Sequence, residues 1–146
     1  MATYNKFNQF VEDLAHGVHN FNTDVIKYAL CATANAPVAT NSVLLDLTVI
    51  PYTNLTDDGT GGPPGEIGSP TSEGTDGSYE LILTDLTITA SGGAIAAFQY
   101  IVIYNDTPTP TPADPLIAWF DYGSALTLST GESLLIDFAA NFLTIS

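Results

Sequence analysis

Short apolar segments with a period of two, separated by glycine and proline turns, constrain this chain most strongly. Successive side chains of a strand point to opposite faces of a sheet, so this alternation indicates strands that are buried on one face. The spacing of 8–12 residues between turns is typical of an antiparallel sandwich or a barrel-like roll. The predicted strands span 24–32, 47–52, 79–83, 86–90, 94–104, 116–121, 125–129, 134–139 and 142–145.

A different period occurs once, near the N-terminus. Five apolar residues recur at helical spacing there: Phe7, Phe10, Val11, Leu14 and Val18. This stripe predicts one amphipathic helix over 4–16, which Gly17 ends and which needs a sheet to pack against. The expected fold class is mostly β, an antiparallel β-sandwich or jelly-roll-like domain with one N-terminal amphipathic helix. The sequence leaves the choice between a jelly roll and another sandwich topology open.

Two segments stand out in this expected body. The segment 94–104 is apolar at both odd and even positions, which is typical of a central strand covered on both faces. The segment 53–78 is rich in glycine, proline and acids, and we expect it to be a long exposed loop. The length of 146 residues predicts a single domain, 1–146, with an N-terminal arm and helix over 1–19 and a β-rich body over 23–146.

The charge balance excludes several classes of partner. Sixteen acids stand against two lysines and no arginine, giving a formal net charge of −14. No basic patch is therefore available to neutralise phosphates, so we expect neither nucleic-acid binding nor binding to an anionic membrane. No apolar run approaches 18 residues, and the first residues lack the apolar core of a signal peptide, which predicts synthesis in a cytoplasm. The single Cys31 excludes an intramolecular disulfide.

Residues that could carry chemistry are few. Glu12, His16 and His19 are the best candidate metal ligands, but the spacing is not H-E-x-x-H and no second histidine pair exists. The acidic run at Asp57 and Asp58 lacks the alternating ligands of an EF-hand. No nucleophile elbow, phosphate-binding loop or dinucleotide fingerprint is present. We therefore expect a protein that is not an enzyme and that uses no metal or cofactor.

The aromatic residues of two predicted strands allow two interpretations. Large side chains at period two usually belong to a sheet core, and the alternative is an exposed platform on which sugars stack. A platform would make the chain a carbohydrate-binding module or an adhesin. The residues concerned are Phe98, Tyr100, Tyr104, Trp119, Phe120 and Tyr122.

Several strings resemble a family of small structural proteins from tailed-bacteriophage virions. They are YNKFNQFVEDL (4–14), GVHN (17–20), APVATNSVL (36–44), TITASGG (87–93), YNDTP (104–108), ADPLI (113–117) and DYGS (121–124). The segment 53–78 departs from the family in both composition and length. The resemblance implies a virion structural protein, specifically a head decoration (cement) protein on the surface of the assembled capsid.

This resemblance also implies partners. Decoration proteins of this kind bind the major capsid protein, often as trimers where three subunits meet, so the expected partners are the capsid lattice and further copies of the chain. We expect the N-terminal arm and the acidic loop to face the lattice or the other copies. The contact residues proposed on this basis are Met1, Tyr4, Lys6, Asp57, Asp58 and Glu66. The alternatives are another virion component, such as a tail or connector protein, and the sugar-binding module.

Overall fold

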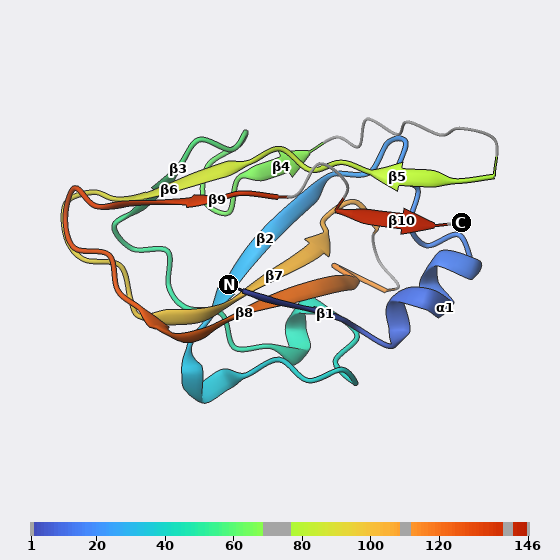
Figure 1. Cartoon of the computed structure of the whole chain (residues 1–146), viewed down its shortest axis with the longest axis horizontal. Helices are drawn as coiled ribbons and strands as arrows, with labels where there is room; N and C mark the ends of the chain where they lie inside the picture. Colours follow the sequence, from blue (N-terminus) through green and yellow to red (C-terminus); the bar gives the residue numbers. More distant parts are fainter. Residues whose placement is uncertain (1, 69–76, 109–111, 139–141, 146) are drawn as a thin grey trace.

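The computed structural model describes residues 2–68, 77–108, 112–138 and 142–145. All pairings between its strands are antiparallel, and one α-helix lies near the N-terminus. The predicted mostly β, antiparallel sandwich-like class with one helix is therefore confirmed (Figure 1). The elements are β1 (Thr3–Lys6), α1 (Gln9–Ala15), β2 (Ile26–Cys31), β3 (Leu55–Asp57), β4 (Glu66–Gly68), β5 (Tyr79–Leu81), β6 (Leu86–Ala90), β7 (Phe98–Asn105), β8 (Leu116–Leu126), β9 (Ser133–Ile136) and β10 (Leu143–Ile145), with 3₁₀ turns at Thr33–Asn35 and Leu44–Asp46.

These strands form two layers. One layer is a five-stranded sheet in the order β1-β8-β7-β2-β4. A three-stranded sheet, β3-β6-β9, and the pair β10-β5 lie opposite it and make the second layer (Figure 1). The main apolar core fills the space between the layers, and its largest fully buried side chains include Tyr28, Phe98 and Ile103.

A second core lies on the other face of the five-stranded sheet. Phe7, Val102 and Trp119 belong to it, and partly buried Leu44, Leu47 and Val49 pack over them from the segment before β3. Strand β7 lies between the two cores, and all eight of its residues are buried. The prediction of a central strand covered on both faces is thus confirmed.

The prediction of a helix over 4–16 is wrong at its first end. Thr3–Lys6 form β1, which pairs with β8 from Thr3 opposite Asp121 to Lys6 opposite Ala118, and α1 spans only Gln9–Ala15. The helical stripe is also divided, because Phe7 belongs to the second core, Phe10 to the first, and Val11 is 51% exposed. Pairing with a neighbouring strand outweighs the local helical pattern here.

Three other predictions from the sequence need correction. The described part of 53–78 is not one irregular loop, because it contains β3 and β4 with buried Leu55 and Ile67; residues 69–76 lie outside the described part. The expected strands 116–121 and 125–129 are one strand, β8, which continues through the predicted turn to Leu126. The segment 47–52 forms only an isolated bridge between Val49 and Cys31.

The predicted break near Thr84 is confirmed, since β5 and β6 lie on either side of it.

Candidate functional site

The N-terminal arm lies along one edge of the five-stranded sheet. Tyr4 in β1 is 42% exposed, and its ring contacts those of Phe120 and Phe142 edge-on at centroid distances of 5.6 and 6.0 Å. Lys6 is exposed, whereas Met1 lies outside the described residues. Tyr4 and Lys6 are therefore surface side chains on an ordered strand, and burial of the Tyr4 ring raises the pKa of its hydroxyl.

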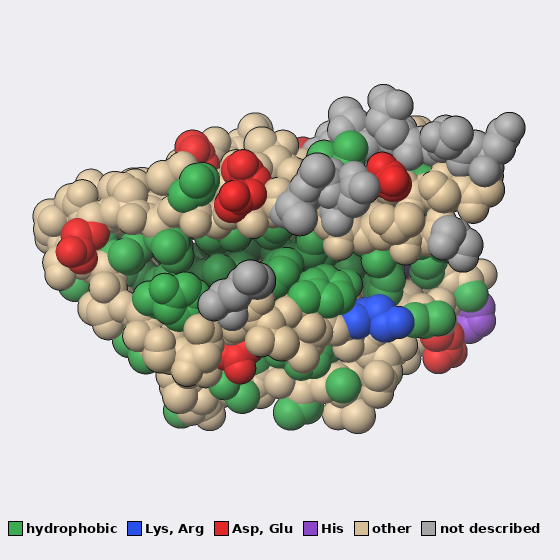
Figure 2. Space-filling view, in the orientation of Figure 1, with side chains coloured by type: hydrophobic (Ala, Val, Ile, Leu, Met, Phe, Trp, Pro, Cys, Tyr) green, Lys and Arg blue, Asp and Glu red, His purple; other side chains and the backbone are tan. Residues whose placement is uncertain are grey.

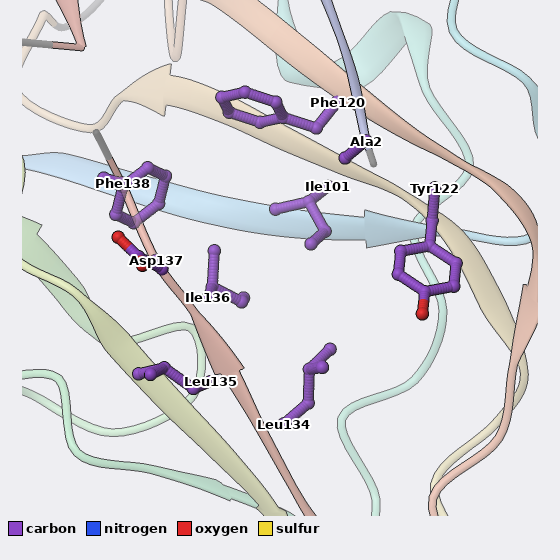
Figure 3. A pocket seen from close by; sticks show the side chains of 9 residues that line it. All are labelled: Ala2, Ile101, Phe120, Tyr122, Leu134, Leu135, Ile136, Asp137 and Phe138. Carbon is purple, nitrogen blue, oxygen red and sulfur yellow. The ribbon is translucent and has the colours of Figure 1, made fainter.

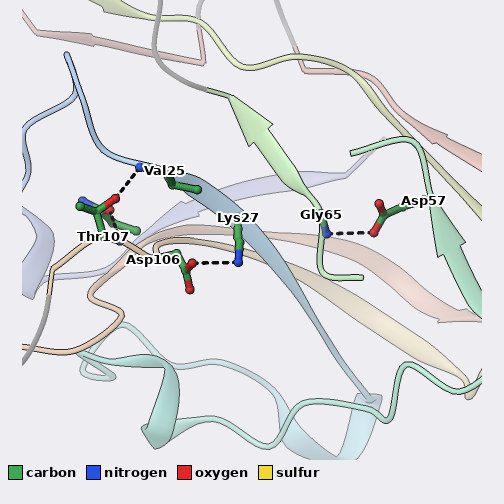
Figure 4. A network of polar contacts seen from close by, with 7 residues as sticks. Val25, Lys27, Asp57, Gly65, Asp106 and Thr107 are labelled. Atoms are coloured by element: carbon green, nitrogen blue, oxygen red, sulfur yellow. Dashed lines mark hydrogen bonds and ion pairs between the residues drawn. The ribbon is translucent and has the colours of Figure 1, made fainter. Parts of the chain in front are cut away.

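The carboxylate of Asp57 is held in place by hydrogen bonds from its own fold. Its Oδ2 accepts hydrogen bonds from the Gly65 backbone N–H at 2.9 Å (Figure 4) and from the Tyr28 hydroxyl at 2.6 Å. Its Oδ1 accepts one from Gly59 N–H at 3.1 Å. Tyr28 comes from β2 and is completely buried, so this carboxylate joins β3 to the five-stranded sheet and also orders the turn after β3.

Asp58 is exposed, whereas Glu66 in β4 is half-buried. Asp58 Oδ1 accepts a hydrogen bond from the Thr87 backbone N–H at 2.7 Å, which lowers the pKa of this carboxyl group. With Asp85 they line a polar hollow of about 200 Å³. In the part of the chain that the structure describes, no three histidine, cysteine or acidic side chains are arranged to hold a metal ion.

The structure does not bring the two predicted contact regions together. Tyr4 and Lys6 are in β1, whereas Glu66 is in β4, and these are the opposite edges of the five-stranded sheet. Strands β8, β7 and β2 separate them. A single flat partner surface therefore cannot contact both regions through one edge of this sheet.

One side of the sandwich is closed by backbone hydrogen bonds. Strand β4 pairs with β2, and the carbonyl oxygen of Ile67 in β4 accepts a hydrogen bond from Thr84 N–H at 2.8 Å. Thr84 lies between β5 and β6 of the second layer. Strand β4 thus bridges the two layers along this side.

The other side of the sandwich is open. Its borders are β1, at the edge of the five-stranded sheet, and β9, at the edge of the three-stranded sheet; among the described residues, β1 pairs only with β8 and β9 only with β6. We call the gap between these two edges the open seam. Figure 2 shows a continuous band of apolar side chains between the two layers on this face.

An apolar groove of about 150 Å³ lies within the open seam (Figure 3). Ile101 and Ile136 form its floor, Tyr122 and Leu135 are 46% and 58% exposed, and Asp137 is its one charged lining residue. An exposed apolar surface beside charged groups is typical of an interaction site. The complete lining is Ala2, Ile101, Phe120, Tyr122, Leu134, Leu135, Ile136, Asp137 and Phe138.

Sequence reasoning did not identify this groove. The segment 122–124 is expected from the sequence to be a turn, and Tyr122 enters the sequence analysis only as part of a candidate sugar-stacking platform. Gly123 instead adopts φ +87°, a conformation that glycine reaches without strain, and β8 continues past it. The apolar alternation at 134–138 was the available signal, but it indicates only a strand and not that this strand is an edge.

Most of the aromatic residues considered for sugar stacking are in the cores. Trp119 is 8% exposed, and its ring lies 4.5 Å from that of Phe7, centroid to centroid, in the second core. Phe98, Tyr100 and Tyr104 are also buried, and only Tyr122 is well exposed. These burials favour the core interpretation for Trp119 and for the β7 aromatics.

The candidate metal ligands near α1 are divided between surface and interior. His16 and Glu12 are exposed, with His16 Nδ1 3.9 Å from Glu12 Oε1. His19 is 6% exposed, and its Nδ1 lies 3.1 Å from Asn105 Nδ2, which also donates to Asp24 Oδ2 at 2.6 Å. An amide nitrogen donates only, so Nδ1 is the acceptor and the proton of the neutral ring is on Nε2. His19 thus belongs to a buried polar cluster.

Several strings that carry the phage-protein resemblance lie next to one another. Backbone N–H groups donate to carbonyl oxygens between them, from Asn8 to Ala39 at 2.9 Å and from Leu44 to Asp114 at 3.0 Å. A third such bond joins Leu116 N–H to the Ser42 carbonyl at 3.0 Å. Three strings that are distant in the sequence, 4–14, 36–44 and 113–117, therefore form one region of the fold.

Comparisons with protein-family models, with curated proteins and with solved structures each gave no significant match. Within the described residues, no helix is long and apolar enough to cross a membrane.

Proposed function

We propose that this protein is a decoration (cement) protein of a tailed-bacteriophage head. It binds the assembled lattice of the major capsid protein, as a homotrimer, and stabilises the shell without catalysis. The proposal starts from the resemblance of the strings described above. Three of these strings adjoin in the structure, so the resemblance concerns a coherent part of the fold.

The observation that carries the proposal is the exposed apolar groove in a strongly acidic molecule. Each copy has a net charge of −14, which keeps free copies apart in solution. Attachment to a lattice at high copy number then requires apolar contacts that outweigh the repulsion between neighbouring copies. The groove offers such contacts, and the predicted contact residue Tyr4 lies on the strand that borders it.

A bound decoration protein stabilises the shell by mass action. A ligand that binds the intact lattice, and not its dissociated subunits, shifts the equilibrium towards the intact state. Many modest contacts across subunit joints therefore raise the temperature at which capsids burst.

Reconstitution on capsids tests this proposal. Purified protein is mixed with capsids that lack it, and the bound copies are counted by quantitative gel densitometry and cryo-electron microscopy. We expect saturation at one trimer per threefold position and capsid opening at a higher temperature. Absence of binding to heads, with incorporation into tails or connectors of the same phage, would reject a head location in favour of another virion component.

The sugar-binding alternative has a separate test. Only Tyr122 among the candidate platform residues is well exposed. Binding to a glycan array that is lost in Tyr122→Ser, and that is kept in a variant of the exposed but distant Leu45, would favour this alternative over the decoration role.

A further inference from the structure

The two sides of the sandwich differ by one strand. On the closed side, β4 pairs with β2 and reaches the second layer through the hydrogen bond from Thr84 N–H to the Ile67 carbonyl. On the open seam, the described residues supply no equivalent strand between β1 and β9. The interior that β4 covers on one side is left as an apolar groove on the other (Figure 2).

The borders of the open seam have the chemistry of strand addition. In an antiparallel pair, alternate N–H and C=O groups of each strand point away from its partner. Strand β9 pairs with β6 from Leu86 opposite Ile136 to Thr89 opposite Ser133, so the outer backbone groups of β9 face the seam. Such an edge can accept an extended peptide, which gains main-chain hydrogen bonds and places alternate side chains in a pocket.

The groove has a buried floor that can hold apolar side chains, and aromatic rings close it at one end. Ile101 and Ile136 lie at its bottom, and in Figure 3 Tyr122 from the first layer and Leu134 from the second also point towards it, whereas Leu135 points to the other side of β9. Beyond Phe138 the seam is closed by aromatic contacts, since the rings of Phe138 and Phe142 meet edge-on at 6.1 Å and Tyr4 contacts Phe142 at 6.0 Å. A guest strand would therefore lie along β9 and end at these rings.

Charge decides between the possible occupants. Asp137 is the charged lining residue, and Asp85 lies beside the groove because its Oδ1 accepts the backbone N–H of Phe138 at 2.8 Å. A second copy would carry a further net charge of −14. Of its two lysines, Lys27 is already paired with Asp106, Nζ to Oδ2 at 2.8 Å (Figure 4). A segment with basic side chains complements this border, and an acidic one is repelled.

We propose that the open seam binds an extended segment of a partner protein, which pairs with the free edge of β9, inserts apolar side chains into the groove and places lysine or arginine beside Asp137. This inference names a binding surface and the chemistry of its partner. It holds for a head, tail or connector partner, and so it does not rest on the proposed decoration function.

A peptide titration tests strand addition directly. The probe is a capped eight-residue peptide in which valine alternates with lysine, added to the full-length protein at low ionic strength. Two matched controls are a peptide with glutamate in place of lysine and a lysine peptide whose central amides are N-methylated and cannot pair. We expect binding of the first peptide at least tenfold tighter than of either control. Amide chemical-shift changes and exchange protection should centre on Ser133–Ile136.

Protein variants test the site. Tyr122→Ser removes a groove side chain that is 46% exposed, and Leu45→Ser removes one that is 93% exposed on a segment covering the other face of the five-stranded sheet. We expect the first variant to bind the lysine peptide about five- to tenfold more weakly and the second to bind it as the wild type does. Both positions are exposed, so both variants should fold, which their circular dichroism spectra check.

Four results would overturn the inference. The first is no binding at millimolar peptide, and the second is equal binding of the N-methylated peptide, which would indicate charge attraction alone. The third is protection of amides outside the seam. The fourth is reversible self-association of the wild type that Tyr122→Ser abolishes, which would identify a second copy as the occupant. A negative peptide result combined with normal decoration of capsids would reject the strand addition and leave the proposed function standing.

Discussion

The Tyr28 hydroxyl donates a 2.6 Å hydrogen bond to Oδ2 of Asp57, and this contact joins the two layers of the sandwich inside the core. Burial of Tyr28, together with this carboxylate, raises the pKa of the phenol far above its usual range, so the hydroxyl remains the donor. Asp57 also holds the turn between β3 and β4 through Gly59 and Gly65.

Removing this hydroxyl should destabilise the fold. In Tyr28→Phe, a half-buried carboxylate oxygen loses the donor that a buried phenol supplies, and we expect the free energy of unfolding to fall by about 1.5–3 kcal/mol. Urea denaturation followed by fluorescence measures the change. Tyr122→Phe is the matched control because Tyr122 is 46% exposed, and it should change stability by less than about 0.5 kcal/mol. Equal effects in the two variants would mean that the Tyr28–Asp57 contact contributes nothing specific.

The turn that Asp57 orders should not tolerate a side chain at Gly59. A Cβ atom built there would lie 2.9 Å from both the Cα and the carbonyl carbon of Gly65, and backbone atoms cannot move aside cheaply. We expect Gly59→Ala to lower the free energy of unfolding by about 1–3 kcal/mol, the usual cost of overpacking. The neighbouring Thr60→Ala, at an exposed position, is the control for changes in this turn. An unaltered urea midpoint for Gly59→Ala would contradict the close approach.

His19 should make stability depend on pH below neutrality. Burial lowers the pKa of its ring below 6.5, and the nearby Asp13 and Asp24 oppose this shift only in part. The unfolded chain therefore binds a proton at higher pH than the folded chain does. The contribution of His19 is fully present above about pH 6.5 and is lost as the pH falls towards the folded-state pKa.

Urea midpoints measured between pH 7.5 and 5.5 check this dependence. We expect a decline in the wild type, a flatter profile in His19→Gln, and an unchanged profile in His16→Gln, whose side chain is exposed. The slope over this range is the readout, so a lower absolute stability of His19→Gln does not affect the comparison. A wild-type profile that rose on acidification would contradict the sign.

Cys31 should be chemically silent in the folded protein. It is completely buried in β2, and burial raises the pKa of its thiol to about 11, so little thiolate is present at neutral pH. Thiols react as thiolates, and we therefore expect labelling by iodoacetamide or Ellman's reagent to be slow in buffer and fast in denaturing urea. Rapid stoichiometric labelling under native conditions would show that the core opens readily around β2.

The sequence predicted the fold class because period two and regular turns are local signals, whereas edges and coverage are not local. Thr3–Lys6 joined β8 because a strand edge was available, which no spacing of Phe7 and Phe10 could reveal. Strand β4 was hidden in a glycine-rich segment, and Ile67 was its one buried apolar residue. The double coverage of β7 was predictable because both of its faces are apolar in the sequence itself.

The candidate site also depends on contacts between distant parts of the chain, which local sequence patterns do not predict. Asp57 was chosen as an exposed acid of a loop, but its three donors come from Tyr28, Gly59 and Gly65, and only the fold brings Tyr28 there. The open seam depends on which strands end up at the two edges. That arrangement is a property of sheet order, and it could not be predicted from alternation in any one segment.

The two layers of the sandwich are held together more strongly on one side than on the other. The layers are joined by backbone bonds at β4 and by the Tyr28–Asp57 contact, whereas β1 and β9 share no such bond among the described residues. We therefore expect the two layers to separate more readily along the open seam than along the side closed by β4. Amide protons of β9 should therefore exchange earlier than those of β2 and β7. A partner segment bound in the open seam would join the two layers on this side and slow that exchange.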